Sequence, residues 1–128
     1  MINGNKSLFV LLSALLMIAS SARGSDILAQ GVSEANGSKF NYSVIDLGSN
    51  GRRIEVIHNP EKYDGLLAEM SFRDRHLQVF GMVAKLIQSN CPNGVDSLGN
   101  IYVSKDPEQD EDPEAEHPKY FSWEYICK

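Results

Sequence analysis

Three histidines, His58, His76 and His117, carry the side chains of this sequence that titrate near neutral pH. A ribonuclease-like hydrolase would bring such a histidine and a carboxylate to one phosphate, with an arginine nearby to hold the negative charge. Arg53 and Glu55 are two residues apart in a predicted strand and share a face, whereas His58 points to the opposite face. A catalytic site of Glu55, Arg53 and a histidine from another element therefore stays open, and a small extracellular hydrolase is the alternative function.

Short motifs of well-understood catalytic chemistry are absent from the sequence. The chain contains no serine elbow, no phosphate-binding glycine loop and no zinc-binding helix motif. Its cysteines and histidines also lack the spacing of a metal site. We therefore predict no cofactor and no bound metal, and the sequence gives no positive sign of catalysis.

An acidic tract from Asp106 to Glu116 holds seven of the 17 acidic residues, together with two prolines. It lacks the central glycine and the final glutamate of an EF-hand loop, so we do not expect a dedicated calcium site. We interpret the tract as an exposed loop that adds little to stability and that could speed association with a basic partner. The candidate partner-binding residues are Asp110, Glu111, Asp112, Glu114 and Glu116.

The N-terminus has the pattern of a secretory signal peptide. Lys6 precedes a largely apolar run at residues 8–19, and small residues follow, with cleavage expected after Ala22 or Gly24. The apolar run is shorter than the roughly 20 residues of a membrane-spanning helix, and no second apolar run follows. We therefore expect residues 1–24 to be removed and the mature protein to be secreted, extracellular or periplasmic, without a membrane anchor.

Cys91 and Cys127 are the two cysteines of the chain, and export would favour their oxidation. They can form one disulfide within the chain. In the chain-entropy model, closing a loop of about 37 residues stabilises the fold by roughly 3 to 4 kcal/mol. We predict this disulfide rather than a reactive thiol or a metal ligand.

The charge distribution outside the acidic tract is nearly balanced, although the whole chain has a formal net charge of −5. Proteins that bind nucleic acid usually have a basic surface, and this sequence does not indicate one. We therefore expect no nucleic-acid partner. The oligomeric state is not indicated by the sequence.

Residues 72–89 have the strongest secondary-structure pattern and predict an amphipathic helix. Ser71 supplies an N-cap, while Asn90 and Pro92 end the helix. The polar positions recur at steps of four and three and form one narrow stripe, so the wide apolar remainder indicates a helix packed against a sheet. The stripe consists of Asp74, Gln78, Gly81, Lys85 and Gln88.

Four segments have β-strand patterns, which gives the element order β-β-α-β-β. A turn at residues 48–51 joins the first two strands into a hairpin. Asn59 and Pro60 could open a short helix, and residues 66–70 could be its last turn, a lead-in to the main helix or a short strand; we favour the helix. Gly and Pro signals predict a loop from residue 92 to residue 100. The predicted strands are residues 40–47, 53–58, 101–105 and 120–127.

The last predicted strand alternates, so Phe121, Trp123 and Tyr125 share a face with Cys127. A bond from Cys127 to Cys91 would turn this face toward the C-terminal end of the helix, and the three rings would form the floor of the core. The sequence thus predicts a small single α+β domain at residues 39–128. It would consist of a four-stranded antiparallel sheet, one main helix on one face, and a disulfide from the helix to the last strand.

Residues 25–38 show little periodicity and are rich in Gly, Ser and Asn, so we interpret them as a flexible lead-in. Asn36 and Asn41 each begin a short glycosylation acceptor pattern. This pattern is relevant only in a eukaryotic source, and the sequence does not indicate the source. Glycosylation at these two positions therefore stays open.

Small size, predicted export, one disulfide and the lack of a catalytic motif favour a role in binding another protein. An inhibitor, an immunity-like protein or a secreted effector would fit this description. A periplasmic assembly or chaperone factor is the second alternative, and it predicts an exposed apolar groove. Because the helix is committed to the core, the loops and the outer face of the sheet are the surfaces expected to recognise a partner.

Overall fold

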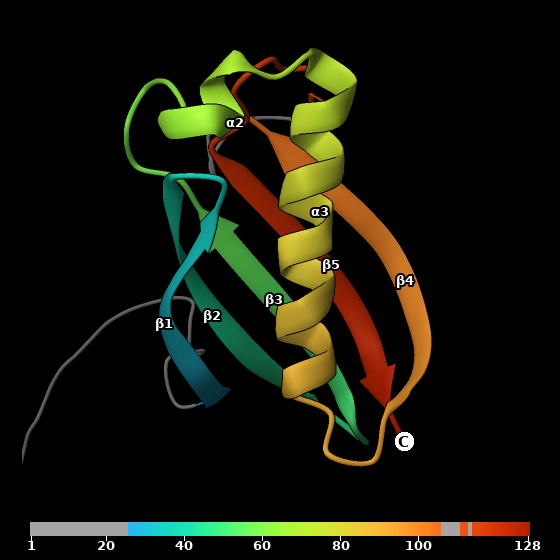
Figure 1. Ribbon diagram of the computed structural model, residues 1–128. Helices are drawn as coiled ribbons and strands as arrows, with labels where there is room; N and C mark the ends of the chain where they lie inside the picture. The colour runs from blue at the N-terminus through green and yellow to red at the C-terminus, as the bar shows by residue number, and fades with distance from the viewer. Residues whose placement is uncertain (1–25, 106–110, 113) are drawn as a thin grey trace, which may run out of the picture.

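The computed structural model describes residues 26–105, 111–112 and 114–128 of the 128-residue chain. The predicted signal peptide, residues 1–24, and the candidate residue Asp110 lie outside the described residues. Figure 1 shows an antiparallel sheet with a long helix across one face, so the domain is α+β as predicted. The elements are β1 (Ile27–Ala35), β2 (Ser38–Gly48), β3 (Gly51–Ile57), α2 (Gly65–Glu69), α3 (Phe72–Ser89), β4 (Val95–Ser104) and β5 (Tyr120–Cys127).

The sheet has five strands, in the order β1-β2-β3-β5-β4, and the prediction of four strands is wrong. The additional strand, β1, pairs with β2 and occupies most of the segment expected to be a flexible lead-in, residues 25–38. β1 lies at the sheet edge, and most of its side chains are exposed on either face. A strand without a buried face has no alternation of apolar and polar residues, so periodicity could not reveal it.

β4 begins at Val95, earlier than the predicted start at residue 101. Its pairing with β5 changes register at two places, one of them between Leu98 and Ile101. At Gly99, inside this irregular stretch, a Cβ would lie 3.0 Å from the carbonyl oxygen of Glu124. The glycine that suggested a loop therefore marks a bulge inside a strand, where the backbone of β5 approaches closely.

α3 has the bounds predicted for the main helix. The hydroxyl of Ser71 accepts a hydrogen bond from the backbone N–H of Asp74 at 3.2 Å, which is the expected N-cap. All five residues of the predicted polar stripe are exposed. Leu77, which the pattern assigned to the buried face, is 53% exposed because it faces a groove beside β1 rather than the sheet.

The face of β5 that carries Cys127 packs toward α3, as predicted. Phe121 and Tyr125 are buried, and the ring of Phe80 from α3 lies edge-on to Phe121 with a centroid distance of 5.9 Å. Trp123 is only partly buried at the margin of this core. The predicted aromatic floor is therefore present, with its two buried rings under the helix.

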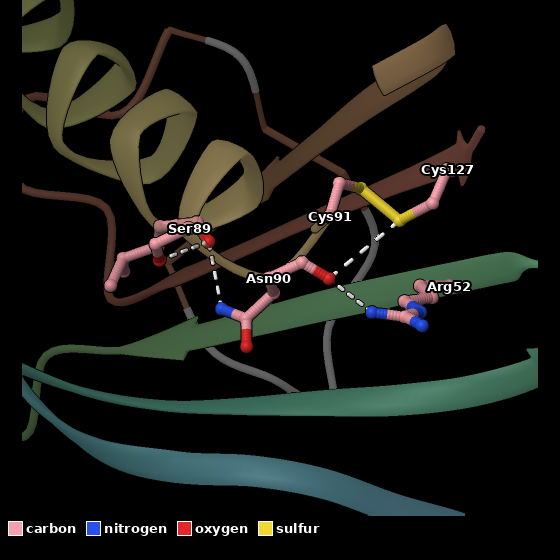
Figure 2. The surroundings of a disulfide bond; sticks show 6 residues. Arg52, Ser89, Asn90, Cys91 and Cys127 are labelled. Atoms are coloured by element: carbon pink, nitrogen blue, oxygen red, sulfur yellow. Dashed lines mark hydrogen bonds between the residues drawn. A yellow bond between two sulfur atoms is a disulfide. The ribbon is translucent and has the colours of Figure 1, made fainter. Parts of the chain in front are cut away.

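The predicted disulfide joins Cys91, after the C-terminal end of α3, to Cys127 at the end of β5 (Figure 2). Beside it, the guanidinium of Arg52 on β3 donates a hydrogen bond to the backbone carbonyl of Asn90, the C-cap of the helix. A cation at this end stabilises the carbonyl groups that have no partner within the helix and the negative end of the helix dipole. The disulfide is also consistent with an oxidising, secreted environment.

The N-terminal end of α3 is held by the buried Arg75, which is 8% exposed. Its guanidinium donates hydrogen bonds to the carbonyls of Met70 at 2.8 Å, Ala68 at 3.4 Å and Glu116 at 2.7 Å. Ala115, next to the last of these residues, is 3% exposed. The backbone at the described end of the acidic tract is thus packed on the domain, while the side chains of Glu111, Glu114 and Glu116 are exposed.

Candidate functional site

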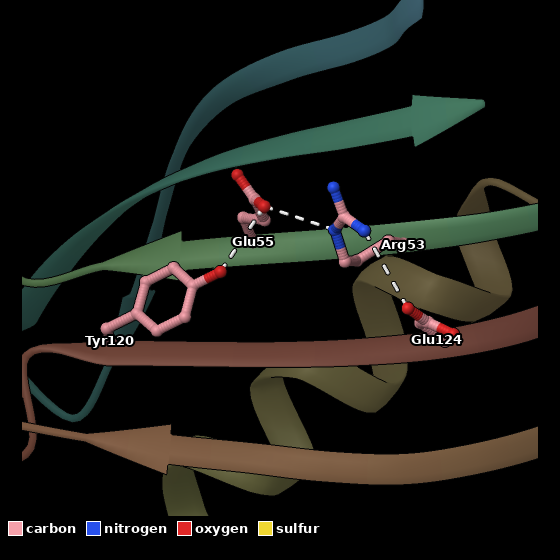
Figure 3. Close-up of polar contacts among 4 residues, drawn as sticks. All are labelled: Arg53, Glu55, Tyr120 and Glu124. Carbon is pink, nitrogen blue, oxygen red and sulfur yellow. Dashed lines mark hydrogen bonds and ion pairs between the residues drawn. The ribbon is translucent and has the colours of Figure 1, made fainter. Parts of the chain in front are cut away.

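Arg53 and Glu55, which the sequence left open as part of a catalytic site, lie on the outer face of the sheet, opposite α3 (Figure 3). Ile54 between them is fully buried on the inner face, so strand alternation explains their position. Tyr120 and Glu124 of the neighbouring strand β5 face the same side. We call Arg53, Glu55, Tyr120 and Glu124 the outer-face cluster.

The outer-face cluster lines an open hollow of about 500 Å³ on the sheet surface. β5 adds Ser122 to its lining, and β4 adds Asn100 and Tyr102. The ring of Tyr102 lies edge-on to that of Tyr120, with 5.9 Å between the centroids. The hollow therefore presents two phenol rings, one guanidinium and two carboxylates within three adjacent strands.

Arg53 joins the two carboxylates of the cluster. Its Nε lies 3.1 Å from Oε2 of Glu55, and its Nη1 lies 3.7 Å from Oε2 of Glu124. The hydroxyl of Tyr120 donates a hydrogen bond to the same oxygen of Glu55 at 3.3 Å. The carboxylate of Glu55 is thus held by a cation on its own strand and by a phenol from the neighbouring strand.

The pKa of Tyr120 is raised above its usual range, chiefly by burial and then by the negative charge of Glu55. The phenol therefore stays protonated at neutral pH and remains a hydrogen-bond donor. Glu55 accepts hydrogen bonds from this phenol and from Arg53, so its carboxylate is held in place as an acceptor. The arrangement is suited to recognising charge and hydrogen-bonding groups.

His58 and His117 lie away from the outer-face cluster and contact Tyr63 instead. The ring of His58 is 1% exposed and packs edge-on to Tyr63 at 4.9 Å, while the backbone N–H of Tyr63 donates to Nδ1 of His117 at 3.1 Å. Burial is the main cause that lowers the pKa of both histidines, and the charge of Arg75 lowers that of His117 further. Both rings are therefore neutral parts of the packing at neutral pH.

His76 also lies away from the cluster, on the opposite side of the sheet. Its ring packs against Phe72 at 4.3 Å and Phe80 at 5.8 Å, and its Nδ1 lies 3.0 Å from the carbonyl oxygen of Phe72. The proposed combination of Glu55, Arg53 and a histidine therefore does not assemble.

The acidic candidates of the predicted loop lie at the end of the molecule where β4 stops. The backbone N–H of Asp112 donates to the carbonyl of Val103 at 2.7 Å, and its carboxylate lies 3.9 Å from the ammonium of Lys105. Asp110 lies outside the described residues, so it is not placed. A role of these carboxylates in binding a partner stays a prediction. The exposed members are Glu111, Glu114 and Glu116.

An apolar patch adjoins the outer-face cluster. Leu47, Leu98 and Ile126 are 46%, 54% and 44% exposed, and all three line a second hollow of about 320 Å³. Glu124 lines this hollow as well as the polar one. The two hollows are thus neighbours, and together they form one surface with a polar and an apolar part.

Sequence reasoning did not include Tyr120 and Glu124 among the site residues. A signal was available, because both alternate with the core positions of the last strand and must point away from the helix. The pairing of β3 with β5, which brings Glu124 opposite Arg53, was not predictable from either strand alone.

No family model, curated protein or solved structure matches this chain. Among the described residues, no group of three or more His, Cys, Asp or Glu side chains could hold a metal ion. No helix in the described part of the chain has the length and apolar character to cross a membrane. The functional conclusion therefore rests on the geometry of the surfaces.

Proposed function

We propose that this protein is exported and acts by binding another protein through the outer face of its sheet. The observation that carries the proposal is the outer-face cluster, in which Arg53 and Tyr120 are fixed around one carboxylate in an open hollow. Arginine and tyrosine are enriched at the energetic centres of protein interfaces. Because these side chains already hold one another, their ordering would cost little entropy on binding.

The apolar patch beside the cluster also favours the outer face as the binding surface. Leu47, Leu98 and Ile126 would supply apolar area that leaves water on association, beside polar groups that fix the orientation of the partner. The cluster itself contains one cation and two carboxylates, so its net charge is negative. A partner with a basic group facing Glu124 and an apolar group facing the patch would be complementary.

The binding function can be tested with substitutions that leave the core intact. The partner would be isolated on the immobilised protein, identified and purified, and its Kd would be measured by calorimetry. We expect Tyr120→Ala and Glu124→Lys each to weaken binding at least tenfold. Glu69→Lys changes an exposed carboxylate of α2 and serves as the control. Equal affinities of the wild type and all three variants would rule out the outer face as the binding surface.

A small hydrolase is the second candidate, because Glu55 and Glu124 flank Arg53 in one hollow. Without a histidine, the proton donor would have to be Tyr120, whose raised pKa makes it a weak acid at neutral pH. Hydrolysis of RNA or of a model phosphodiester, abolished by Glu55→Gln, would favour this candidate over binding.

Export can be tested separately. We expect N-terminal sequencing of the protein recovered outside the producing cytoplasm to begin after Ala22 or Gly24. An intact Met1 in the exported protein would contradict the proposed signal peptide.

A further inference from the structure

A groove lies between the helix α3 and the edge strand β1. It is on the side of the sheet that α3 covers, opposite to the outer-face cluster; Figure 1 shows the course of the helix and the strand. Its volume is about 620 Å³, and it runs along residues 33–36 on one side and residues 77–89 on the other. The side-chain amide of Asn36 donates to Oε1 of Gln78 at 2.8 Å and bridges the two walls. We call this feature the β1–α3 groove.

β1 offers an open backbone edge to this groove. As the first strand of the sheet it pairs only with β2, so the N–H and C=O groups on its other side lack a strand partner. Natural edge strands are usually protected by Lys, Pro or bulges, but β1 contains no Lys, Arg or Pro, and its one register irregularity lies at its start, between Ile27 and Ala29, away from the groove. Its exposed side chains include Ile27, Leu28 and Val32. The opposite edge, β4, has two register irregularities that disturb such pairing.

Gly81 lies in the helical wall of the groove, in the interior of the 18-residue helix α3. Glycine is less favourable than alanine at such a position, yet a Cβ on Gly81 would meet no described atom within 4 Å. Gly31 of β1 differs, because a Cβ there would lie 3.2 Å from the hydroxyl of Tyr42. Packing thus accounts for Gly31 but not for Gly81, whose missing side chain leaves room for a second backbone to approach the helix.

Lys85 gives the groove its charge. The side chain is exposed on the helical wall and forms no ion pair with any described residue. Glu34 is the other charged residue of the groove, but it stands opposite Lys39 in the register with β2 and, by alternation, on the outer face. The helical side therefore combines one positive charge with the partly exposed apolar side chains of Leu77 and Leu86.

We propose that the β1–α3 groove binds an extended acidic segment of a partner protein, which adds to the sheet as a sixth strand beside β1. Its backbone would pair with β1 and pass Gly81, an apolar side chain would contact Leu77, and an acidic side chain would face Lys85. β1 ends at Ala35, and the carbonyl of Asn36 already accepts a hydrogen bond from the backbone N–H of Leu67 at 3.0 Å. At about 3.3 Å per residue, the groove wall at residues 33–35 therefore accommodates roughly three residues of such a segment. Strand addition of this kind draws affinity from the main chain and specificity from alternate side chains.

The proposal can be tested with displayed peptides. A phage library of random nonapeptides, each fused to the coat protein through its C-terminus, would be selected on the purified protein. We expect enriched sequences to combine β-branched or apolar residues with Asp or Glu. A synthetic, C-terminally amidated copy of the best sequence would then be titrated by fluorescence anisotropy.

Two substitutions separate binding from folding. Gly81→Gln fills the groove with a good helix former, so we expect at least a tenfold loss of peptide affinity with an unchanged or higher melting temperature. Lys85→Glu should weaken binding of the acidic peptide at least tenfold, and a peptide with Lys in place of its acid should regain affinity for this variant. Arg73→Glu, a charge reversal at an exposed position of α3 that does not line the groove, is the control.

Hydrogen exchange gives an independent measure, because the amides of β1 that face away from β2 should become protected when the peptide binds. A library without enrichment, or peptides that bind both groove variants as tightly as the wild type, would overturn the proposal. A dimer in sedimentation experiments that Gly81→Gln dissociates would also overturn it, since a second copy would then occupy the groove. Outer-face substitutions such as Tyr120→Ala should leave peptide binding unchanged, so the two proposals fail independently.

Discussion

The two ends of α3 are fastened to the rest of the domain by different chemistry. At the disulfide end, Cys91 is bonded to Cys127 and Arg52 binds the last carbonyl of the helix cap. At the arginine end, Arg75 donates hydrogen bonds to three backbone carbonyls and no covalent bond is present. One end is restrained even in the unfolded chain, whereas the other is held only by non-covalent contacts, among them the hydrogen bonds of Arg75. We therefore expect the two ends to respond to different perturbations.

The largest effect should come from the disulfide end. Replacing both Cys91 and Cys127 with Ala releases a loop of about 37 residues, which should lower the free energy of unfolding by about 4 kcal/mol in the chain-entropy model. Urea unfolding of the variant and of the oxidised wild type, followed by tryptophan fluorescence, measures this difference. Coincident unfolding midpoints would mean that Arg52 and the core hold this end without the disulfide.

Removing Arg75 at the other end of α3 should lower the free energy of unfolding by somewhat less. Arg75→Met keeps an unbranched side chain but leaves the carbonyls of Met70 and Glu116 without their buried donor, which should cost about 2 to 3 kcal/mol. The control is Arg73→Met, because Arg73 is exposed on the same helix. Hydrogen exchange should show faster opening of α2 and of the first turns of α3, with little change near Cys91. Opening spread evenly along α3 would show that the two ends are not independent.

A smaller effect should follow from pH, and it should act on the arginine end. The pKa values of His58 and His117 are lowered in the folded state, mainly by burial, so the unfolded chain binds more protons below its histidine pKa of about 6.5. The contribution of these two histidines to the free energy of unfolding is fully present above a pH of about 6.5. It is lost as the pH falls from about 6.5 toward their lowered pKa values in the folded state. Thermal unfolding between pH 7.5 and 5 should therefore show a declining melting temperature.

The pH effect has its own control. His117→Asn keeps an acceptor for the backbone N–H of Tyr63 but cannot gain a proton in this range, so its melting temperature should decline less steeply. An equally steep decline would place the acid sensitivity at another group, for example at His58. The reduced and oxidised proteins should show the same dependence, because the disulfide does not titrate.

Of the two attachments of α3, one was predictable from the sequence and the other was not. The disulfide was predictable because two cysteines allow one pairing, and the periodicity of Cys127 with Phe121 and Tyr125 indicated the direction of the last strand. Arg75 was not recognised as the centre of the other end. Its partners are backbone carbonyls, which leave no trace in the sequence, and an arginine beside Asp74 at the start of a helix resembles any solvated residue.

The candidate sites likewise combine features that the local sequence predicts with contacts between distant residues that it does not. Arg53 and Glu55 could be placed on one face from their spacing alone, but their partner Tyr120 lies 65 residues from Glu55 in the chain. The groove beside α3 was also invisible, because β1 was expected to be a flexible lead-in and Leu77 a buried residue. The sequence left open a site in which a histidine joins Arg53 and Glu55, and the structure does not form it for a related reason, since all three histidines belong to packing clusters away from the outer face.

The sequence by itself determined the main helix, the last strand, the disulfide and the α+β class, because these depend on local periodicity, on capping residues and on a single possible pairing. Only the tertiary structure decided that β5 lies between β3 and β4, that a fifth strand forms the free edge, and which side chains meet on each face. The physical reason is that periodicity fixes which side of an element is buried. Periodicity does not fix which helix or strand lies beside a given element. A functional surface consists of side chains from several adjacent elements, so it depends on that arrangement.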